Sequence, residues 1–299
     1  HIIVDQGQAE IAGYTNREEG LFNEVPVIIF GDHTRLIKYI DEPFFLGADG
    51  VKVLRSKEKN ANYKYLYYAL KSAKIPNTGY NRHFKWLKDV EINYPDSVKQ
   101  EKIVDILDRV SDVIEKRKAE LSYLVTLIKA RFVEMFGDPI INSKGLETKE
   151  LNEVLVLKAG DFTAASDISV EPTEINIYPC YGGNGIRGYV AEYNQEGEYS
   201  LVGRQGALSG NVQYATGKFK NTEHALLVKP IIRMNSIWLN QLLLNLDLKR
   251  YQTGAAQPGL SVKNLQDIQI IMVPIDEQRQ FAAFVNEIDK SKLQKFSAA

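Results

Sequence analysis

The sequence predicts an α+β protein in which two similar domains are joined and spaced by long antiparallel coiled-coil helices. The first observation is an apolar series at heptad spacing between Val98 and Phe136, which predicts a helix of 39 residues. The second is a set of short motifs that returns in the same order 172 to 178 residues later, which indicates an internal duplication. The third is a string of short apolar runs bounded by Gly, Asp and Asn, which are typical of strands.

The first domain is expected over residues 1–94. Its predicted strands are a run from residue 1 to 4, then 25–30, 51–54 and 90–94, with a helix over 62–73 and a loop over 79–83. The chain begins with His1, directly in a strand-like run, and the first copy has no counterpart of residues 143–177. We therefore expect this domain to be incomplete at its N-terminus.

A spacer helix is expected over residues 95–137. Ser97 with Gln100 three residues later predicts a capping box, and Gly137 followed by Pro139 predicts the end of the helix. At about 1.5 Å of rise per residue the helix is roughly 58 Å long. An apolar seam of this length needs a partner helix. The seam residues expected to contact it are Ile103, Leu107, Val110, Ile114, Leu121, Leu124, Ile128 and Met135, with Arg117 and Arg131 at the skipped positions.

The second domain is expected over residues 138–274. Residues 151–157 are helical or extended, a glycine-rich stretch follows at 181–189, and strands are predicted at 199–202, 212–214, 225–228 and 267–273. A helix is predicted over 236–246 and a loop over 253–259. The duplicated spacer helix, residues 275–299, is expected to be short and to supply the partner through Phe281, Val285 and Ile288.

Composition narrows the class of protein. The chain has 37 basic and 38 acidic residues, so a nucleic-acid partner would require basic residues to be concentrated on one surface. Cys180 is the only cysteine, which excludes an internal disulfide, and we expect it to be a small core residue. No apolar run reaches the ~18 residues of a membrane span, so we expect a cytoplasmic protein without a membrane partner.

Catalytic motifs are missing from the sequence. The histidines His1, His33, His83 and His224 are dispersed, and none has metal-ligand spacing. There is no phosphate-binding loop, no nucleophile elbow and no methyltransferase motif. Glu147 to Lys149 and Pro95-Asp96 could be halves of a nuclease site, but they flank a long helix and would lie far apart. We therefore expect no catalytic residue and no metal site in this chain.

Polar residues gather instead around the glycine-rich turns. Arg and Lys can read guanine, and Asn and Gln can read adenine. The candidate DNA-binding residues of the second domain are Tyr181, Asn184, Arg187, Arg204, Gln205, Asn211, Lys218 and Gln257. Those of the first domain are Gln6, Gln8, His33, Arg35, Lys38, Tyr80, Asn81 and Arg82, with Asp32 in the same region. The surrounding glycines are explained by tight turns alone, and His224 by a local hydrogen bond.

The two copies keep a common frame and differ at the loop tips. Residues 32–35 (Asp-His-Thr-Arg) stand where residues 204–207 (Arg-Gln-Gly-Ala) stand in the second copy. This pattern predicts a reader of two different half-sites. A rod of roughly 58 Å spans between one and two turns of duplex at about 34–36 Å per turn, so unread base pairs would lie between the half-sites.

The sequence resembles the specificity subunits of type I restriction-modification systems over essentially the whole chain. The residues that carry the resemblance are Gly203 to Gly206 with Gly210, Gly217 to Phe219, Thr222 to Ala225, Gly259 to Ser261 with Leu265, and the PIDEQ entry at 274–278 that echoes SVKQEKIVDIL at 97–107. Family members normally continue further at both ends.

The resemblance implies two target-recognition domains that each read one half of an asymmetric site in double-stranded DNA. It implies that the paired helices set the gap and dock two modification subunits, which carry S-adenosylmethionine and methylate adenine at N6. Restriction subunits that use ATP and Mg would join a larger assembly. This chain would then hold no cofactor. Three alternatives stay open: a stand-alone DNA-binding repressor or decoy, an inactive truncated copy, and a two-domain nuclease.

Overall fold

The computed structural model describes residues 1–206, 208–254 and 258–297, with side chains of the last helix described up to Ser291. The chain divides into two compact units, His1–Lys118 and Ala119–Ala299, and the long helix α3 (Ser97–Phe136) passes from one to the other. Within the described part of the chain, no helix is both long and apolar enough to cross a membrane.

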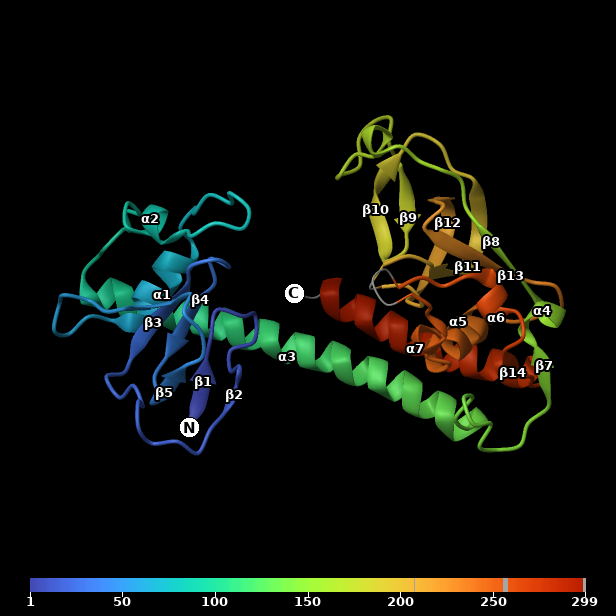
Figure 1. Ribbon diagram of the computed structural model, residues 1–299, viewed down its shortest axis with the longest axis horizontal. Coiled ribbons are helices and arrows are strands. Elements are labelled where there is room, and N and C mark those ends of the chain that lie inside the picture. The colour runs from blue at the N-terminus through green and yellow to red at the C-terminus, as the bar shows by residue number, and fades with distance from the viewer. Residues whose placement is uncertain (207, 255–257, 298–299) are drawn as a thin grey trace. The chain divides into compact units, whose positions relative to one another are not determined.

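Unit 1 contains two small sheets, two short helices and the first half of α3 (Figure 1). Its strands are β1 (Ile2–Val4), β2 (Gly13–Tyr14), β3 (Val27–Gly31), β4 (Ile37–Ile40), β5 (Phe44–Leu46) and β6 (Val51–Leu54), and its short helices are α1 (Tyr63–Lys71) and α2 (Phe84–Leu87). The sheets have the strand orders β2-β1-β5 and β4-β3-β6. Val4, Val27 and Phe44 are fully buried between them and form the core.

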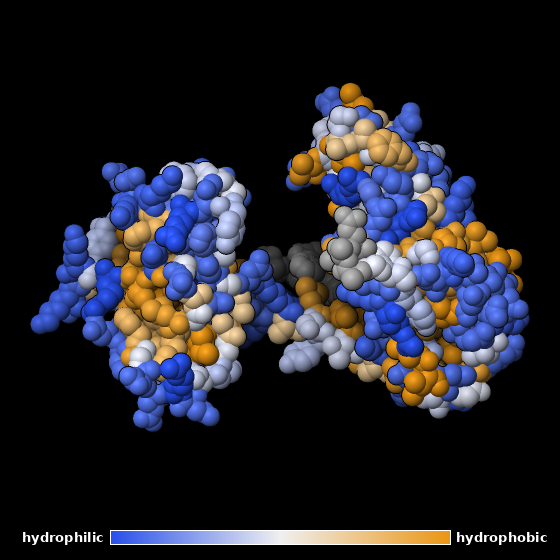
Figure 2. Space-filling view, viewed as in Figure 1, coloured by the Kyte–Doolittle hydropathy of each residue, from blue (hydrophilic) through white to orange (hydrophobic). Residues whose placement is uncertain are grey.

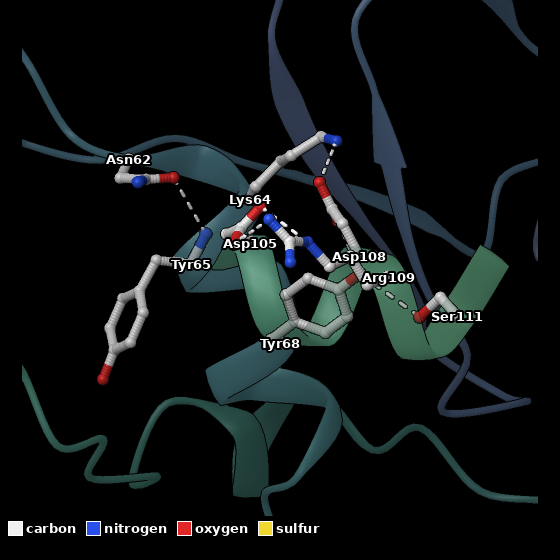
Figure 3. Close-up of polar contacts among 8 residues, drawn as sticks. All are labelled: Asn62, Lys64, Tyr65, Tyr68, Asp105, Asp108, Arg109 and Ser111. Carbon is white, nitrogen blue, oxygen red and sulfur yellow. Dashed lines mark hydrogen bonds and ion pairs between the residues drawn. The ribbon is translucent and has the colours of Figure 1, made fainter. Parts of the chain in front are cut away.

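Helix α1 is attached to α3 by a polar cluster (Figure 3). Asn62 caps α1 by accepting a hydrogen bond from the Tyr65 N–H at 3.0 Å. Asp108 of α3 accepts from Lys64 Nζ at 2.6 Å and from the Tyr68 hydroxyl at 2.7 Å. Burial raises the pKa of Asp108, but these two donors outweigh it, so the pKa is lowered overall.

The start of α3 differs from the predicted capping box. The Asp96 carboxylate, one residue before the helix, accepts from the Lys99 N–H at 3.0 Å, and Gln100 donates its amide to the Pro95 carbonyl at 2.8 Å. Asp96 rather than Ser97 is therefore the N-cap, and the Gln100 N–H that Ser97 would have met donates instead to the Asp96 carbonyl at 3.0 Å. The end is as predicted: Gly137 has φ +77° and donates to the Val133 carbonyl at 2.8 Å.

Unit 2 contains a six-stranded sheet, a two-stranded sheet and the helices that connect and follow their strands (Figure 1). Its strands are β7 (Thr148–Glu150), β8 (Leu155–Ala159), β9 (Tyr178–Gly182), β10 (Gly185–Val190), β11 (Gln195–Gly203), β12 (Val212–Asn221), β13 (Ala225–Pro230) and β14 (Gln269–Ile271). Its helices are α4 (Leu151–Val154), η1 (Ala165–Asp167), α5 (Ser236–Asn245), η2 (Leu248–Tyr251), α6 (Val262–Leu265) and α7 (Ile275–Ser297). The sheet orders are β10-β9-β12-β11-β13-β8 and β14-β7.

The helices of unit 2 share an aromatic core. The Phe281 ring of α7 lies 5.5 Å from Phe132 and 5.7 Å from Phe136 of α3, and Trp238 of α5 packs on Phe136 at 6.2 Å. All four side chains are fully buried. Phe281 belongs to the predicted heptad seam and Phe132 and Phe136 do not, so the helix contact uses seam residues together with neighbours that the heptad pattern did not indicate.

The predicted seam residues have mixed environments. In unit 2, Ile128 and Val285 are buried, and Ile288 packs against the same core. Leu107, Leu121 and Leu124 are half-buried. In unit 1, Ile103, Val110 and Ile114 are 37%, 49% and 47% exposed.

The strands β9 and β10, with η1, form a lobe of unit 2 that exposes apolar side chains. Phe162, Val170 and Ile175 of the segment leading to β9 are 78%, 83% and 75% exposed, and Figure 2 shows orange residues at the top of this lobe. This segment belongs to the part of the second copy that has no counterpart in the first.

Backbone hydrogen bonds confirm the internal duplication. Asp32 N–H donates to the Gly50 carbonyl at 2.8 Å, and Arg204 N–H donates to the His224 carbonyl at 3.1 Å. The carbonyls of the same two residues accept from His83 and Leu260, at 2.7 and 2.9 Å. In both units the residue after a central strand, Asp32 after β3 or Arg204 after β11, is therefore hydrogen-bonded through its backbone to the same two neighbouring segments. We call this arrangement the junction.

The predicted strand at residues 90–94 is wrong, because the structure has no strand there. Its counterpart β14 is a strand because it pairs with β7, with Ile270 opposite Lys149. Residues 90–94 have no such partner within unit 1, since the first copy lacks a counterpart of β7. A strand needs a neighbour for its backbone N–H and C=O groups.

Candidate nucleic-acid interface

The turn between β11 and β12 is the centre of the site in unit 2. The Gly183 carbonyl approaches Gly203 so closely that no Cβ fits there. Gly210 has φ +83° and packs against the backbone of Leu248 and Lys249. These close approaches explain the glycines and bring the β9–β10 turn beside the β11–β12 turn.

Four of the predicted DNA-binding residues come together at this place. Asn211 donates its amide to Asn184 Oδ1 at 2.8 Å across the two turns. Arg204 is half-buried, and Gln205 is exposed, with its Oε1 2.7 Å from His224 Nδ1. His224, which sequence reasoning assigned to a local hydrogen bond, does make one, but its partner is a candidate DNA-reading residue.

Other predicted residues of the second domain lie outside this group. Tyr181 is half-buried on the Phe219 ring at 5.4 Å, and burial raises its pKa, so it acts as a core residue. Arg187 is exposed and its aliphatic part covers Gly182. Lys218 is exposed and its Nζ lies 4.8 Å from the centre of the Tyr193 ring. A hydrogen bond to Tyr193 and then the charge of Glu196 raise the pKa of Lys218. Gln257 lies outside the described residues.

Two basic residues at this site were missed by sequence reasoning. Lys249 and Arg250 are exposed on η2, whose backbone packs against Gly210. Gln252 Nε2 donates to the Ser209 carbonyl and ties the same segment to the turn. The signal available in the sequence was the pair of adjacent cations shortly after α5.

The corresponding site of unit 1 contains different chemistry on the same frame. The His33 ring stacks on the Tyr80 ring with centroids 4.9 Å apart and planes 13° apart, and Tyr80 is 89% exposed. Asn81 donates to the Thr78 carbonyl at 2.6 Å and so fixes the loop that carries Tyr80, and Arg82 is exposed beside it. Sequence reasoning had placed His33 and Tyr80 in separate loops, and the structure joins them.

Arg35 corresponds to Gly210 rather than to Ala207. Both residues have positive φ, +62° and +83°, and both donate their N–H groups to the last residue of the central strand, Gly31 or Gly203, at 2.7 Å. The Arg35 guanidinium donates to the Ile75 carbonyl at 3.3 Å. The Gly31 N–H donates to the Leu36 carbonyl, five residues later, whereas the Gly203 N–H donates to the Asn211 carbonyl, eight residues later. The turn of unit 2 is therefore longer than that of unit 1.

Lys38, Gln6 and Asp32 have structural roles. Lys38 is only 7% exposed, and its ammonium donates to the Ala9 carbonyl and lies 3.7 Å from Asp5. We therefore withdraw Lys38 as a DNA contact. Gln6 is half-buried and accepts from the His33 N–H at 3.1 Å, and buried Asp32 accepts from the Phe84 N–H at 2.8 Å at the start of α2. Gln8 is exposed at a groove of about 1050 Å³ between β4, α1 and α3.

The described residues contain no group of three or more His, Cys, Asp or Glu side chains that could hold a metal ion. Cys180 is buried, and burial raises its pKa above that of a free thiol.

Comparison with known proteins identifies the family. A model of the type I restriction modification DNA specificity domain matches residues 12–123 and again residues 143–296. The EcoprrI type I restriction enzyme specificity subunit of Escherichia coli is 38% identical over 194 residues, which are 64% of this chain and 48% of that protein. A putative type I specificity subunit of Mycoplasma genitalium is 22% identical over 286 residues, 88% of this chain and 73% of that protein.

The solved structures agree on the fold. The crystal structure of a type I restriction-modification S subunit from M. genitalium has a TM-score of 0.59 at 20% identity and covers 100% of this chain and 84% of that one. The chain spans 48%, 40% and 40% of the length of the first three curated relatives that it matches. Two matches to one domain model, in the two halves that share a hydrogen-bonded frame, show that the chain belongs to the family of type I restriction-modification DNA specificity proteins.

Proposed function

We propose that this chain provides the sequence specificity of a type I restriction-modification complex, with each unit reading one half of a bipartite site in double-stranded DNA. The observation that carries the proposal is the repeated junction at the ends of β3 and β11. The frame is the same in both units, while the side chains on it differ: half-buried His33 in one, exposed Gln205 in the other. A duplicated frame with divergent polar tips suits two different half-sites.

The chemistry of each tip is suited to a different kind of contact. In unit 2 the amides of Gln205 and Asn184 and the guanidinium of Arg204 can hydrogen-bond to base edges in the major groove. Lys249 and Arg250 beside them can neutralise phosphates, which supplies affinity without sequence information. In unit 1 the stacked pair of His33 and Tyr80 offers a flat aromatic surface.

The helices are proposed to dock two modification subunits. Apolar side chains on α3 that face solvent support this: Ile106, Val113 and Val125 are 61%, 55% and 62% exposed. Such exposure on a helix is typical of a protein interaction surface. Under this proposal S-adenosylmethionine, ATP and Mg are bound by the partner subunits, and this chain contributes recognition and assembly without catalysis.

The experiment is to co-express the chain with the methyltransferase subunit encoded beside it and to map methylated adenines across the host DNA. We expect a split motif with a fixed gap that disappears when this chain is deleted. A host without such a motif, in which no methyltransferase copurifies with the chain, would contradict the proposal and favour a stand-alone DNA-binding protein. Bare DNA with a divalent metal serves as the control for nuclease activity, and we expect no cleavage.

A further inference from the structure

The backbone around His224 is held on three sides. Thr222 donates both its N–H and its hydroxyl to the Tyr181 carbonyl, at 3.1 and 2.9 Å, and Ala225 N–H closes the turn onto Thr222 at 3.1 Å. The His224 carbonyl accepts from the Arg204 N–H at 3.1 Å. The imidazole therefore projects from a turn with little freedom, directly beside the tip that carries Gln205.

Both ring nitrogens of His224 face oxygen atoms. Nδ1 lies 2.7 Å from Gln205 Oε1, and Nε2 lies 3.1 Å from Glu223 Oε1. An amide oxygen and an ionised carboxylate can only accept hydrogen bonds, so the two contacts are both hydrogen bonds only when both ring nitrogens carry a proton. In that state the ring is positive and the Glu223 carboxylate balances its charge. The Glu223 and His224 side chains are 28% and 38% exposed, so water screens this pair only in part.

The contact with His224 determines which end of the Gln205 amide is available. Because Oε1 accepts from the imidazole, the NH₂ group is the end left to face a ligand. A neutral ring whose single proton faces Glu223 would instead expose an acceptor at Nδ1. The amide would then turn its NH₂ to the ring and present its oxygen outward. The Glu223–His224 pair thus sets whether Gln205 offers a donor or an acceptor.

Resting on the proposed function, we propose that Glu223 and His224 are positioning residues that fix the Gln205 amide so that its NH₂ group reads a hydrogen-bond acceptor on a base edge. We call the contacts from Glu223 through His224 to Gln205 the relay, and unit 1 has no equivalent of it. The carbonyl equivalent to that of His224 belongs to Gly50, which has no side chain, and Gln6 approaches this glycine instead. The relay is therefore a specificity device of unit 2 alone.

The test uses the complex of the full chain with its methyltransferase partner, selecting bound duplexes from a pool randomised over both half-sites. We expect Gln205→Ala to reduce discrimination at one base position of one half-site by about 5- to 100-fold. Glu223→Gln keeps the shape but removes the countercharge. Because a neutral ring can then carry its proton on either nitrogen, we expect the preference for an accepting base edge at that position to weaken. His224→Ala should leave the amide unfixed and weaken the preference without inverting it.

A double variant separates positioning from a direct contact. If His224 acts only through Gln205, His224→Ala has no further effect in a Gln205→Ala background. The other half-site reports that each variant is folded, and Glu171→Gln, an exposed carboxylate in the same unit, is the matched control for the loss of charge. Unchanged base preference in Glu223→Gln and His224→Ala, with Gln205→Ala altering it, would overturn the relay while leaving the proposed function intact. Loss of selective binding in the unaltered complex would overturn both.

Discussion

At the scale of single residues, Arg204 is the side chain best placed to read a base. Its backbone is fixed by hydrogen bonds to His224 and Leu260, and its side chain makes no hydrogen bond or ion pair among the described residues. We expect Arg204→Ala to weaken binding to the specific duplex by ~1–3 kcal/mol, with little change on random DNA. Fluorescence anisotropy with the two duplexes measures this difference.

Arg233→Ala is the matched control for Arg204→Ala. Arg233 is exposed in the same unit but follows β13, whose first residue pairs with Gly203, so it lies past the opposite end of that strand. The control should change neither affinity. If Arg204→Ala weakens specific and random DNA equally, Arg204 contacts a phosphate and does not read a base.

Lys218 allows a test of the electrostatic part of binding. It is exposed beyond Gly217, a residue with φ +74°, and lies over the Tyr193 ring. If it meets a phosphate, Lys218→Gln reduces the slope of log affinity against log salt by about one. Lys229→Gln is the control, because Lys229 is also exposed and also lies over a tyrosine ring, that of Tyr199 at 5.5 Å. Equal slopes in the wild type and Lys218→Gln would rule out the phosphate contact.

At the scale of elements, Asp108 connects α1 to α3 in unit 1 (Figure 3). Lys64 and Asp108 are 43% and 35% exposed, so solvent screens their pair, and we expect Asp108→Asn to lower the free energy of unfolding by only about 0.5–1 kcal/mol at pH 7. The lowered pKa of Asp108 means that this stabilisation is fully present above the unfolded value of about 3.9 and is lost as the pH falls through the lower folded value.

Urea unfolding at pH 7 and at pH 3 measures this effect. The difference between wild type and Asp108→Asn should be present at pH 7 and shrink at pH 3, which lies below the unfolded value, because the carboxyl then takes up protons in the unfolded chain before it does so in the folded protein. Asp105→Asn is the control on the same helix: its pair with Arg109, 2.9 Å apart, is more exposed and is worth at most about 0.5 kcal/mol. A difference for Asp108→Asn that is equal at both pH values would mean that the lost stability comes from packing.

The elements that could be predicted from the sequence are those whose cause is local. The 3.5-residue period identified α3, and the alternating or apolar runs identified β6 and β13. The strand at residues 90–94 was wrong because a strand depends on a partner, and β7 has no copy in unit 1. Ser97 was wrong as the cap because the helix begins one residue earlier, so that the Gln100 N–H already donates to the Asp96 carbonyl. Phe132 was missed because the contact with α7 does not follow the heptad.

The candidate site, like the helices and strands, was predictable only where its cause is local in the sequence. Glycine-rich turns marked where Arg204 and Gln205 lie, but nothing local joins His33 to Tyr80, or Gly210 to Lys249. These contacts close loops of tens of residues, and only the folded sheet brings the segments together. Lys38 shows the opposite error, since a lysine in a short strand can be buried beside a neighbouring carbonyl and carboxylate. The DNA-reading roles themselves stay predictions.

At the scale of the whole molecule, the division into two compact units, each with its own candidate site, argues that the half-sites are read independently. Tyr80 and Arg204 lie in different units and share no contact partner among the described residues. Substitutions at distant sites without shared partners usually add to within about 0.3–0.5 kcal/mol. We therefore expect the losses of specific binding in Tyr80→Ala and Arg204→Ala to sum in the double variant.

The bases that each variant selects test the independence of the two units more directly than the binding energies do. Tyr80→Ala should alter the selected bases in only one half of the bipartite motif, and Arg204→Ala only in the other, with the gap between them unchanged in both. Selection from a pool randomised in both halves and in gap length reads all three quantities at once. Phe84, next to the junction of unit 1, provides a control: Phe84→Leu keeps an apolar side chain at the start of α2 and should leave both halves unaltered. A single substitution that changes both half-sites would show that the units act as one reading surface, because two independent readers have no means of passing a local change from one half-site to the other.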